Sequence, residues 1–107
     1  MSASAEDTPV LDLLASMTAD SVAVSSLDPQ SLMLVRLAAL VAVDAPTASY
    51  LLNLGPAADA GVDADQVRGV LTAVAPIVGT ARVVSATGTI VDALAVAIEV
   101  AEADEQQ

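Results

Sequence analysis

The chain has 107 residues and a formal net charge of −11, and 55% of its residues are hydrophobic, mostly Ala, Val and Leu. It contains no Cys and no His, which excludes disulfides, thiol nucleophiles, Ser-His-Asp catalysis and the usual zinc sites. The strong negative charge argues against nucleic acid and anionic membrane surfaces as partners.

The length predicts one domain, over residues 8–102, between a flexible N-terminus (1–7) and an acidic C-terminal tail (103–107). Because the apolar side chains are small, a monomer would bury a thin core, so we expect a homo-oligomer. Aspartates interrupt the apolar segments before any reaches the roughly 20 residues that span a bilayer. The N-terminus lacks the pattern of a secretory signal, so a soluble, cytoplasmic chain is expected.

Helical periodicity in every long segment predicts an all-α fold of five helices. Asp7 or Thr8 is expected to cap the first helix, with Pro9 in its first turn. One face of this helix would be apolar, formed by Val10, Leu13, Leu14 and Met17. The second helix follows Asp28-Pro29 and is apolar over residues 32–43 except for Arg36, which predicts a central position.

The third helix is expected between Pro46 and Gly61, with a kink or break at Gly55-Pro56. Asp63 or Asp65 would cap the fourth, which Pro76 and Gly79 would end.

The fifth helix should run from Thr80 to about Glu102, with two apolar stripes that predict two packing surfaces. One stripe would cover the core and the other would meet a neighbouring subunit. The stripes comprise Val83, Thr87, Ile90, Leu94, Ala97 and Ala101, and then Val84, Val91, Ala95 and Ile98.

Three segments resemble, in their order, the carboxymuconolactone decarboxylase and alkylhydroperoxidase D-like family of small helical oligomers. They are LDPQSLMLVRLAALVAV, AADAGVDADQVRGVL and APIVGTARVVSATGTIVDAL, within residues 27–94. The resemblance implies a bundle of five to six helices that assembles as a trimer or hexamer.

Redox members of that family carry two Cys and a His at the start of a helix, together with a relay glutamate. The matching positions here are Pro46, Ser49 and Asn53 for the first three, and Leu34 for the glutamate. These residues cannot perform thiol redox chemistry. The resemblance therefore implies an oligomeric small-molecule-binding or structural module, or alternatively a cofactor-free lyase or isomerase acting on a small carboxylate.

Five residues are candidates for binding a small anionic metabolite: Arg36, Ser49, Tyr50, Asn53 and Arg82. Of these, Tyr50 and Arg82 are also the candidates for catalysis. Each also has a structural interpretation. Tyr50, the only aromatic residue, can pack at an interface, and Asn53 can bond the backbone of the predicted kink. Arg36 can pair with an acid such as Asp44, Asp92 or Glu99, and Arg82 can form a similar structural or interface pair. No metal or cofactor is expected, and a larger assembly with a different protein remains a third possibility.

Overall fold

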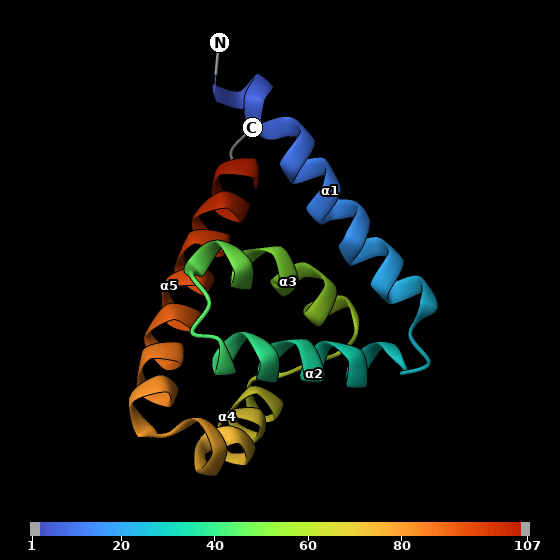
Figure 1. The fold of residues 1–107 in the computed structure, drawn as a ribbon. Helices are drawn as coiled ribbons and strands as arrows, with labels where there is room; N and C mark the ends of the chain where they lie inside the picture. Colours follow the sequence, from blue (N-terminus) through green and yellow to red (C-terminus); the bar gives the residue numbers. More distant parts are fainter. Residues whose placement is uncertain (1–2, 106–107) are drawn as a thin grey trace.

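The part of the chain that the structure describes consists of helices joined by short loops, with no strand. The computed structural model describes the backbone of residues 3–105 and the side chains of residues 8–104. The five helices are α1 (Ala3–Val24), α2 (Pro29–Ala42), α3 (Thr47–Asp59), α4 (Ala64–Val78) and α5 (Thr80–Glu105) (Figure 1). The all-α prediction is therefore confirmed. The outer ends of the two predicted tails, residues 1–2 and 106–107, lie outside the described part.

Helix α2 occupies the centre of the molecule, as its continuous apolar sequence predicts. It contacts α3, α4 and α5 (Figure 1). The carboxylate of Asp28 caps it by accepting a hydrogen bond from the backbone N–H of Ser31 at 3.1 Å, and Pro29 is its first residue. Val41 near its end is completely buried.

Helix α3 runs without interruption through Gly55 and Pro56, so the predicted break is wrong. Pro56 has no N–H to donate to the carbonyl of Leu52. Leu52 is 70% exposed, on a side of α3 that water reaches, so solvent can satisfy that carbonyl. The cost of the missing hydrogen bond is therefore small enough for the helix to continue.

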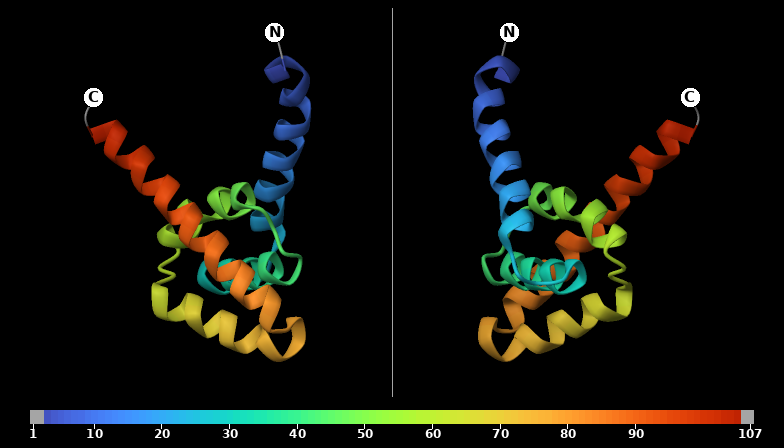
Figure 2. Two further views of the ribbon diagram at one scale, coloured as in Figure 1. Left: turned by 90° about the vertical axis from the view of Figure 1, so that its left-hand side faces the viewer. Right: turned by 90° about the vertical axis from the view of Figure 1, so that its right-hand side faces the viewer.

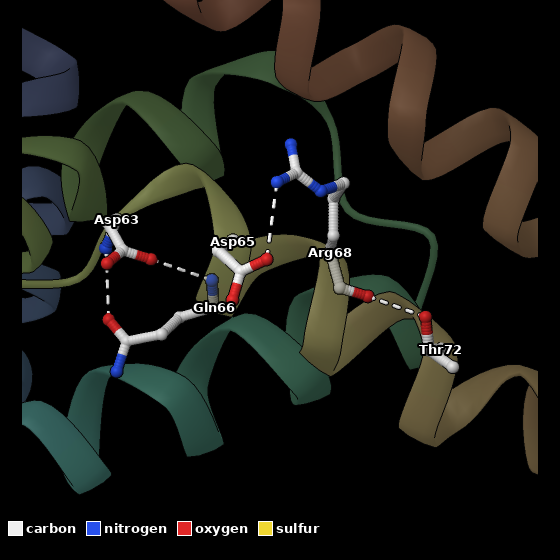
Figure 3. Close-up of polar contacts among 5 residues, drawn as sticks. All are labelled: Asp63, Asp65, Gln66, Arg68 and Thr72. Atoms are coloured by element: carbon white, nitrogen blue, oxygen red, sulfur yellow. Dashed lines mark hydrogen bonds and ion pairs between the residues drawn. The ribbon is translucent and has the colours of Figure 1, made fainter.

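Helix α4 starts with a reciprocal pair of hydrogen bonds between Asp63 and Gln66 (Figure 3). The Asp63 carboxylate accepts from the Gln66 backbone N–H at 2.8 Å, and the Gln66 side-chain oxygen accepts from the Asp63 N–H at 3.0 Å. Asp63 is thus the cap, and Asp65 lies in the first turn. Pro76 is inside the helix rather than at its end. Gly79 alone separates α4 from α5, with φ +91° and ψ 160°, a conformation that is essentially restricted to glycine.

Helix α1 and the C-terminal half of α5 project from the body formed by α2, α3 and α4. Figure 2 shows the described parts of these two helices diverging from each other. The predicted start of α1 is wrong: it begins at Ala3, ahead of Asp7 and Thr8, and Pro9 lies inside it. Good helix formers such as Ala3, Ala5 and Glu6 favour this earlier start. Every side chain of residues 8–24 is exposed.

The core depends on small side chains where α5 meets α3. Ala93 is completely buried and packs with Ala45 and Tyr50, and Ala86 is also buried. These alanines do not belong to either predicted stripe of α5. Val83, Ile90 and Ala97 of the first stripe are nevertheless half-buried, and Ile90 packs against this core, so the first stripe covers the core in part, together with the alanines. The second stripe, from Val84 to Ile98, is exposed.

Helix α5 is also long and apolar enough, over Thr80–Asp104, to cross a membrane by length and composition alone. The sequence analysis expected no apolar segment of this length, because it counted the aspartates that interrupt the chain before α5 and did not consider α5 separately. Asp92 is nevertheless placed near the middle of the helix and is exposed. A carboxylate at that depth of a bilayer costs about 2.5–3.5 kcal/mol on insertion scales.

Candidate functional site

Three of the four positions that the resemblance aligns with the redox motif lie between the start and the middle of α3. Pro46 is the N-cap residue, and no side chain caps the helix. The Ser49 N–H donates to the Pro46 carbonyl at 3.0 Å, and the Asn53 amide donates to the Ser49 carbonyl at 2.9 Å. The fourth position, Leu34, is half-buried on α2. These polar groups are satisfied locally along α3, and Asn53 does not bond a kink.

Tyr50 and Asn53 line a small internal cavity of about 50 Å³. Its remaining walls are apolar side chains from α2, α3, α4 and α5, among them Met33, Leu37, Leu54 and Ile90. This volume is large enough for a water molecule, which occupies about 30 Å³ in the liquid. It is too small for a carboxylated metabolite, since ligand pockets typically span about 300–1,000 Å³.

The Tyr50 hydroxyl is buried without a protein hydrogen-bond partner. The residue is 3% exposed. Burial raises the pKa of the Tyr50 phenol above its usual value of 10.0, and the negative charge of Asp44 raises this pKa further. The hydroxyl is therefore protonated at neutral pH, where it can donate a hydrogen bond but cannot act as a base.

Arg82 and Asp44 connect the end of α2 to the first turns of α5. The Arg82 guanidinium donates to the backbone carbonyl of Ala42, and the Ser85 hydroxyl donates to the Asp44 carboxylate at 2.9 Å. A cation at this position satisfies a terminal carbonyl and the negative end of the helix dipole. Asp44 has φ +55°, in the left-handed region, which Asp tolerates better than most residues. We call these residues, with Ala42, the α2–α5 junction.

Within the described part of one chain, Arg36 does not pair with Asp44, Asp92 or Glu99, so that prediction is wrong there. Its guanidinium instead donates to the backbone carbonyl of Thr18 at 3.1 Å and so attaches α1 to α2. Beside this bond lies an open recess of about 300 Å³, lined by Arg36, Asn53 and three α1 residues, Met17, Thr18 and Ser21, among others. Arg68 pairs with Asp65 at 3.3 Å, with both side chains largely in solvent (Figure 3).

The structure brings only some of the candidate residues together. Tyr50 and Asn53 share the internal cavity, and Asn53 and Arg36 share the recess under α1. Arg82 lines neither space and belongs to the α2–α5 junction. No sequence pattern pairs Asp44 with Ser85, because their hydrogen bond depends on how closely α5 approaches the end of α2.

A larger apolar groove of about 580 Å³ lies between α3, α4 and α5. Its walls include Leu54, Ala58, Val67, Leu71, Ile90 and Leu94, and Arg68 and Asp63 also line it. The sequence analysis assigned Ile90 and Leu94 to an apolar stripe of the fifth helix, but did not predict a groove beside that stripe.

The described residues contain no group of three or more His, Cys, Asp or Glu side chains arranged to hold a metal ion. The arrangement as a whole offers one buried hydrogen-bond donor, a structural polar junction and an apolar groove. Comparison with protein-family models, with curated proteins and with solved structures gives no match for this chain.

Proposed function

We propose that the chain is a self-assembling helical module without thiol redox chemistry, akin to the carboxymuconolactone decarboxylase family that its sequence resembles. Its physiological form would be a homo-oligomer, a trimer or hexamer as that resemblance implies. One observation carries the proposal: large apolar side chains stay exposed along residues 10–24 of α1 and along the outer face of α5, including Leu11, Leu13, Val84 and Ile98.

The buried core supports the same proposal because it is small. Among the described residues, it consists of Leu32, Met33, Val41, Ala45, Tyr50, Ala86 and Ala93, of which three are alanines. Contiguous exposed apolar surface beyond a few hundred Å² is typical of interaction sites. Burying that surface between copies would supply the stabilisation that a single chain lacks.

The structural role is favoured over binding of a small anion. Arg36 and Arg82 both donate to backbone carbonyls, and neither lines the cavity at Tyr50. No observation favours the alternative lyase or isomerase, which needs an anion held beside the Tyr50 phenol. A cytoplasmic location without membrane insertion belongs to the same proposal, because Asp92 lies near the middle of the only candidate membrane span among the described residues.

The mass of the purified chain in solution tests the proposal. We expect sedimentation equilibrium to give a single mass that is a whole-number multiple of the chain mass, as for a trimer or a hexamer. We expect the purified chain to show no turnover in peroxide assays. A monodisperse monomer with native helical content would contradict self-assembly. Turnover of a peroxide by the purified chain would contradict the absence of redox chemistry.

A further inference from the structure

Tyr50 carries a hydrogen-bond donor that the protein itself does not satisfy. The residue is 3% exposed, and its hydroxyl has no partner among the described residues. Asn53, the other polar residue that lines the cavity, uses its amide to donate to the Ser49 carbonyl. Buried donors in native structures are nearly always paired, because an unpaired one loses its bonds to water without replacement. An acceptor from outside the chain is therefore expected at this hydroxyl.

The cavity at Tyr50 adjoins the apolar groove between α3, α4 and α5. The two spaces share five half-buried lining residues: Leu54, Ala57, Val62, Val67 and Ile90. The groove, at about 580 Å³, has the size of a typical ligand pocket. The cavity, at about 50 Å³, is little larger than the roughly 30 Å³ that a water molecule occupies in the liquid. Together they fit a molecule with an apolar chain and one small polar group.

The polar group at Tyr50 has to be neutral. None of the described residues that line the cavity is charged, so a charged group there would be buried without a partner. Asp44, whose negative charge already acts on the Tyr50 phenol, would also repel an anion. The charged residues beside the groove are already engaged, because Asp63 caps α4 and Arg68 pairs with Asp65.

We propose that the groove and the cavity together bind a neutral aliphatic carbonyl compound, such as a long-chain ketone or aldehyde. Its chain lies among the aliphatic side chains of the groove, and its carbonyl oxygen accepts the hydrogen bond that the Tyr50 hydroxyl offers. Changes of rotamer at the shared residues, such as Leu54, join the two spaces when the compound binds. The inference does not depend on self-assembly, because every residue that it uses belongs to one chain.

Titration with methyl hexyl ketone, followed by calorimetry, tests the hydrogen bond. We expect saturable binding to the parent chain and at least about fivefold weaker binding to Tyr50→Phe, which keeps the ring and lacks only the donor. Octanoate has the same number of carbon atoms and an anionic head. It should bind to the parent chain at least about tenfold more weakly than the ketone.

A matched pair of variants on α5 tests whether the aliphatic chain lies in the groove. Val91 and Val100 are 58% and 57% exposed, but only Val91 lines the groove. Val91→Asp should weaken binding of the ketone at least about fivefold, because it places a carboxylate beside the aliphatic chain. Val100→Asp should leave binding unchanged. Helical content by circular dichroism confirms that the variants fold.

The near-ultraviolet absorbance gives a readout at the hydroxyl itself, because Tyr50 is the only aromatic residue. A phenol that donates to a carbonyl absorbs at longer wavelength than an unpaired phenol. The ketone should therefore shift the absorbance of the parent chain to longer wavelength, whereas octanoate at the same concentration should not.

Four results would overturn the proposal. They are no saturable binding of the ketone to the parent chain, equal affinities of the parent chain and Tyr50→Phe, equal affinities of the ketone and octanoate, and unchanged binding by Val91→Asp. A second copy of the chain that fills the groove would give the first result. A water molecule that already satisfies the hydroxyl would give the second.

Discussion

At the scale of single residues, Tyr50 is the least satisfied group in the described core. Its ring is buried against Ala45 and Ala93, while its hydroxyl has no protein partner. Leaving a buried polar group unpaired costs about 1–3 kcal/mol, unless water in the adjacent cavity bonds it.

Replacing Tyr50 by Phe therefore tests whether the hydroxyl contributes to stability through a hydrogen bond. We expect the free energy of unfolding of this variant either to lie within about 0.5 kcal/mol of the parent value or to exceed it by up to about 2 kcal/mol, because the ring is kept and the unpaired group is removed. Urea unfolding measures the change. Tyr50→Ala is the control for the packing of the ring and should cost about 3–5 kcal/mol. A loss above 1 kcal/mol in Tyr50→Phe would mean that the hydroxyl has a partner, such as a bound ligand.

The raised pKa of Tyr50 predicts a loss of stability in alkali. In the unfolded chain the phenol loses its proton near pH 10, whereas in the folded chain it keeps the proton to higher pH. The folded state thus binds more protons above pH 10, and the free energy of unfolding falls there as pH rises. Tyr50→Phe should remove this fall.

The same titration can be followed directly, because Tyr50 is the only tyrosine. Phenolate absorbance should appear above pH 10 in the folded chain. Asp44→Asn should move the midpoint down without restoring it fully, since burial is the larger cause of the shift. Asn also tolerates the left-handed backbone of position 44. A midpoint at or below 10 in the parent chain would show that the phenol is not buried.

At the scale of elements, the start of α4 is fixed by its capping residues rather than by buried side chains. Asp63 and Gln66 satisfy one another's backbone N–H groups, while the Asp65–Arg68 pair lies in solvent. The two aspartates are two residues apart, yet only one of them makes the cap.

Asp63→Ala and Asp65→Ala form a matched pair that separates these roles. We expect Asp63→Ala to lower the free energy of unfolding by about 1 kcal/mol, because the Gln66 N–H loses its acceptor. Asp65→Ala should change it by less than about 0.5 kcal/mol, as is usual for surface pairs. Chemical denaturation of both variants measures the difference. Similar losses in the two variants would assign the effect to negative charge at the helix start instead of the cap.

At the scale of the whole molecule, the net charge of −11 opposes the assembly that the exposed apolar surface favours. Like charges on approaching copies repel, and salt screens this repulsion over about 10 Å at 0.1 M ionic strength. Raising the salt concentration should therefore tighten association. Sedimentation at low and high salt measures it, with Leu14→Asp, which adds one more negative charge, showing the steeper dependence. Weaker association at higher salt would mean that ion pairs, and not apolar contacts, hold the copies together.

The sequence alone was sufficient for the helical class and for the central place of α2, since both follow from periodicity and from a continuous apolar run. It also identified Asp63 as one of two possible caps. It failed at prolines: Pro9, Pro56 and Pro76 all lie inside helices. Local rules treat proline as a boundary, but a helix can continue where water satisfies the carbonyl that the proline leaves unpaired.

The candidate site was harder to predict than the fold. Tyr50 and Asn53 do share a cavity, and their spacing on one helix made that foreseeable. The partners of Arg36 and Arg82 are backbone carbonyls on other helices, and no sequence pattern marks a carbonyl as an acceptor. The groove likewise depends on the distances between three helices, which are set by packing across α3, α4 and α5 and cannot be derived from the periodicity of one helix.

The contact at Ala93 sets the direction of the C-terminal half of α5. Ala93 lies near the midpoint of the helix, fully enclosed with Ala45 and Tyr50, and the helix continues to Glu105, about 18 Å further on. A bulkier side chain at this point would tilt the helix, and its far end would swing in proportion to that length. The size of one methyl group thus determines the direction in which the chain reaches outward.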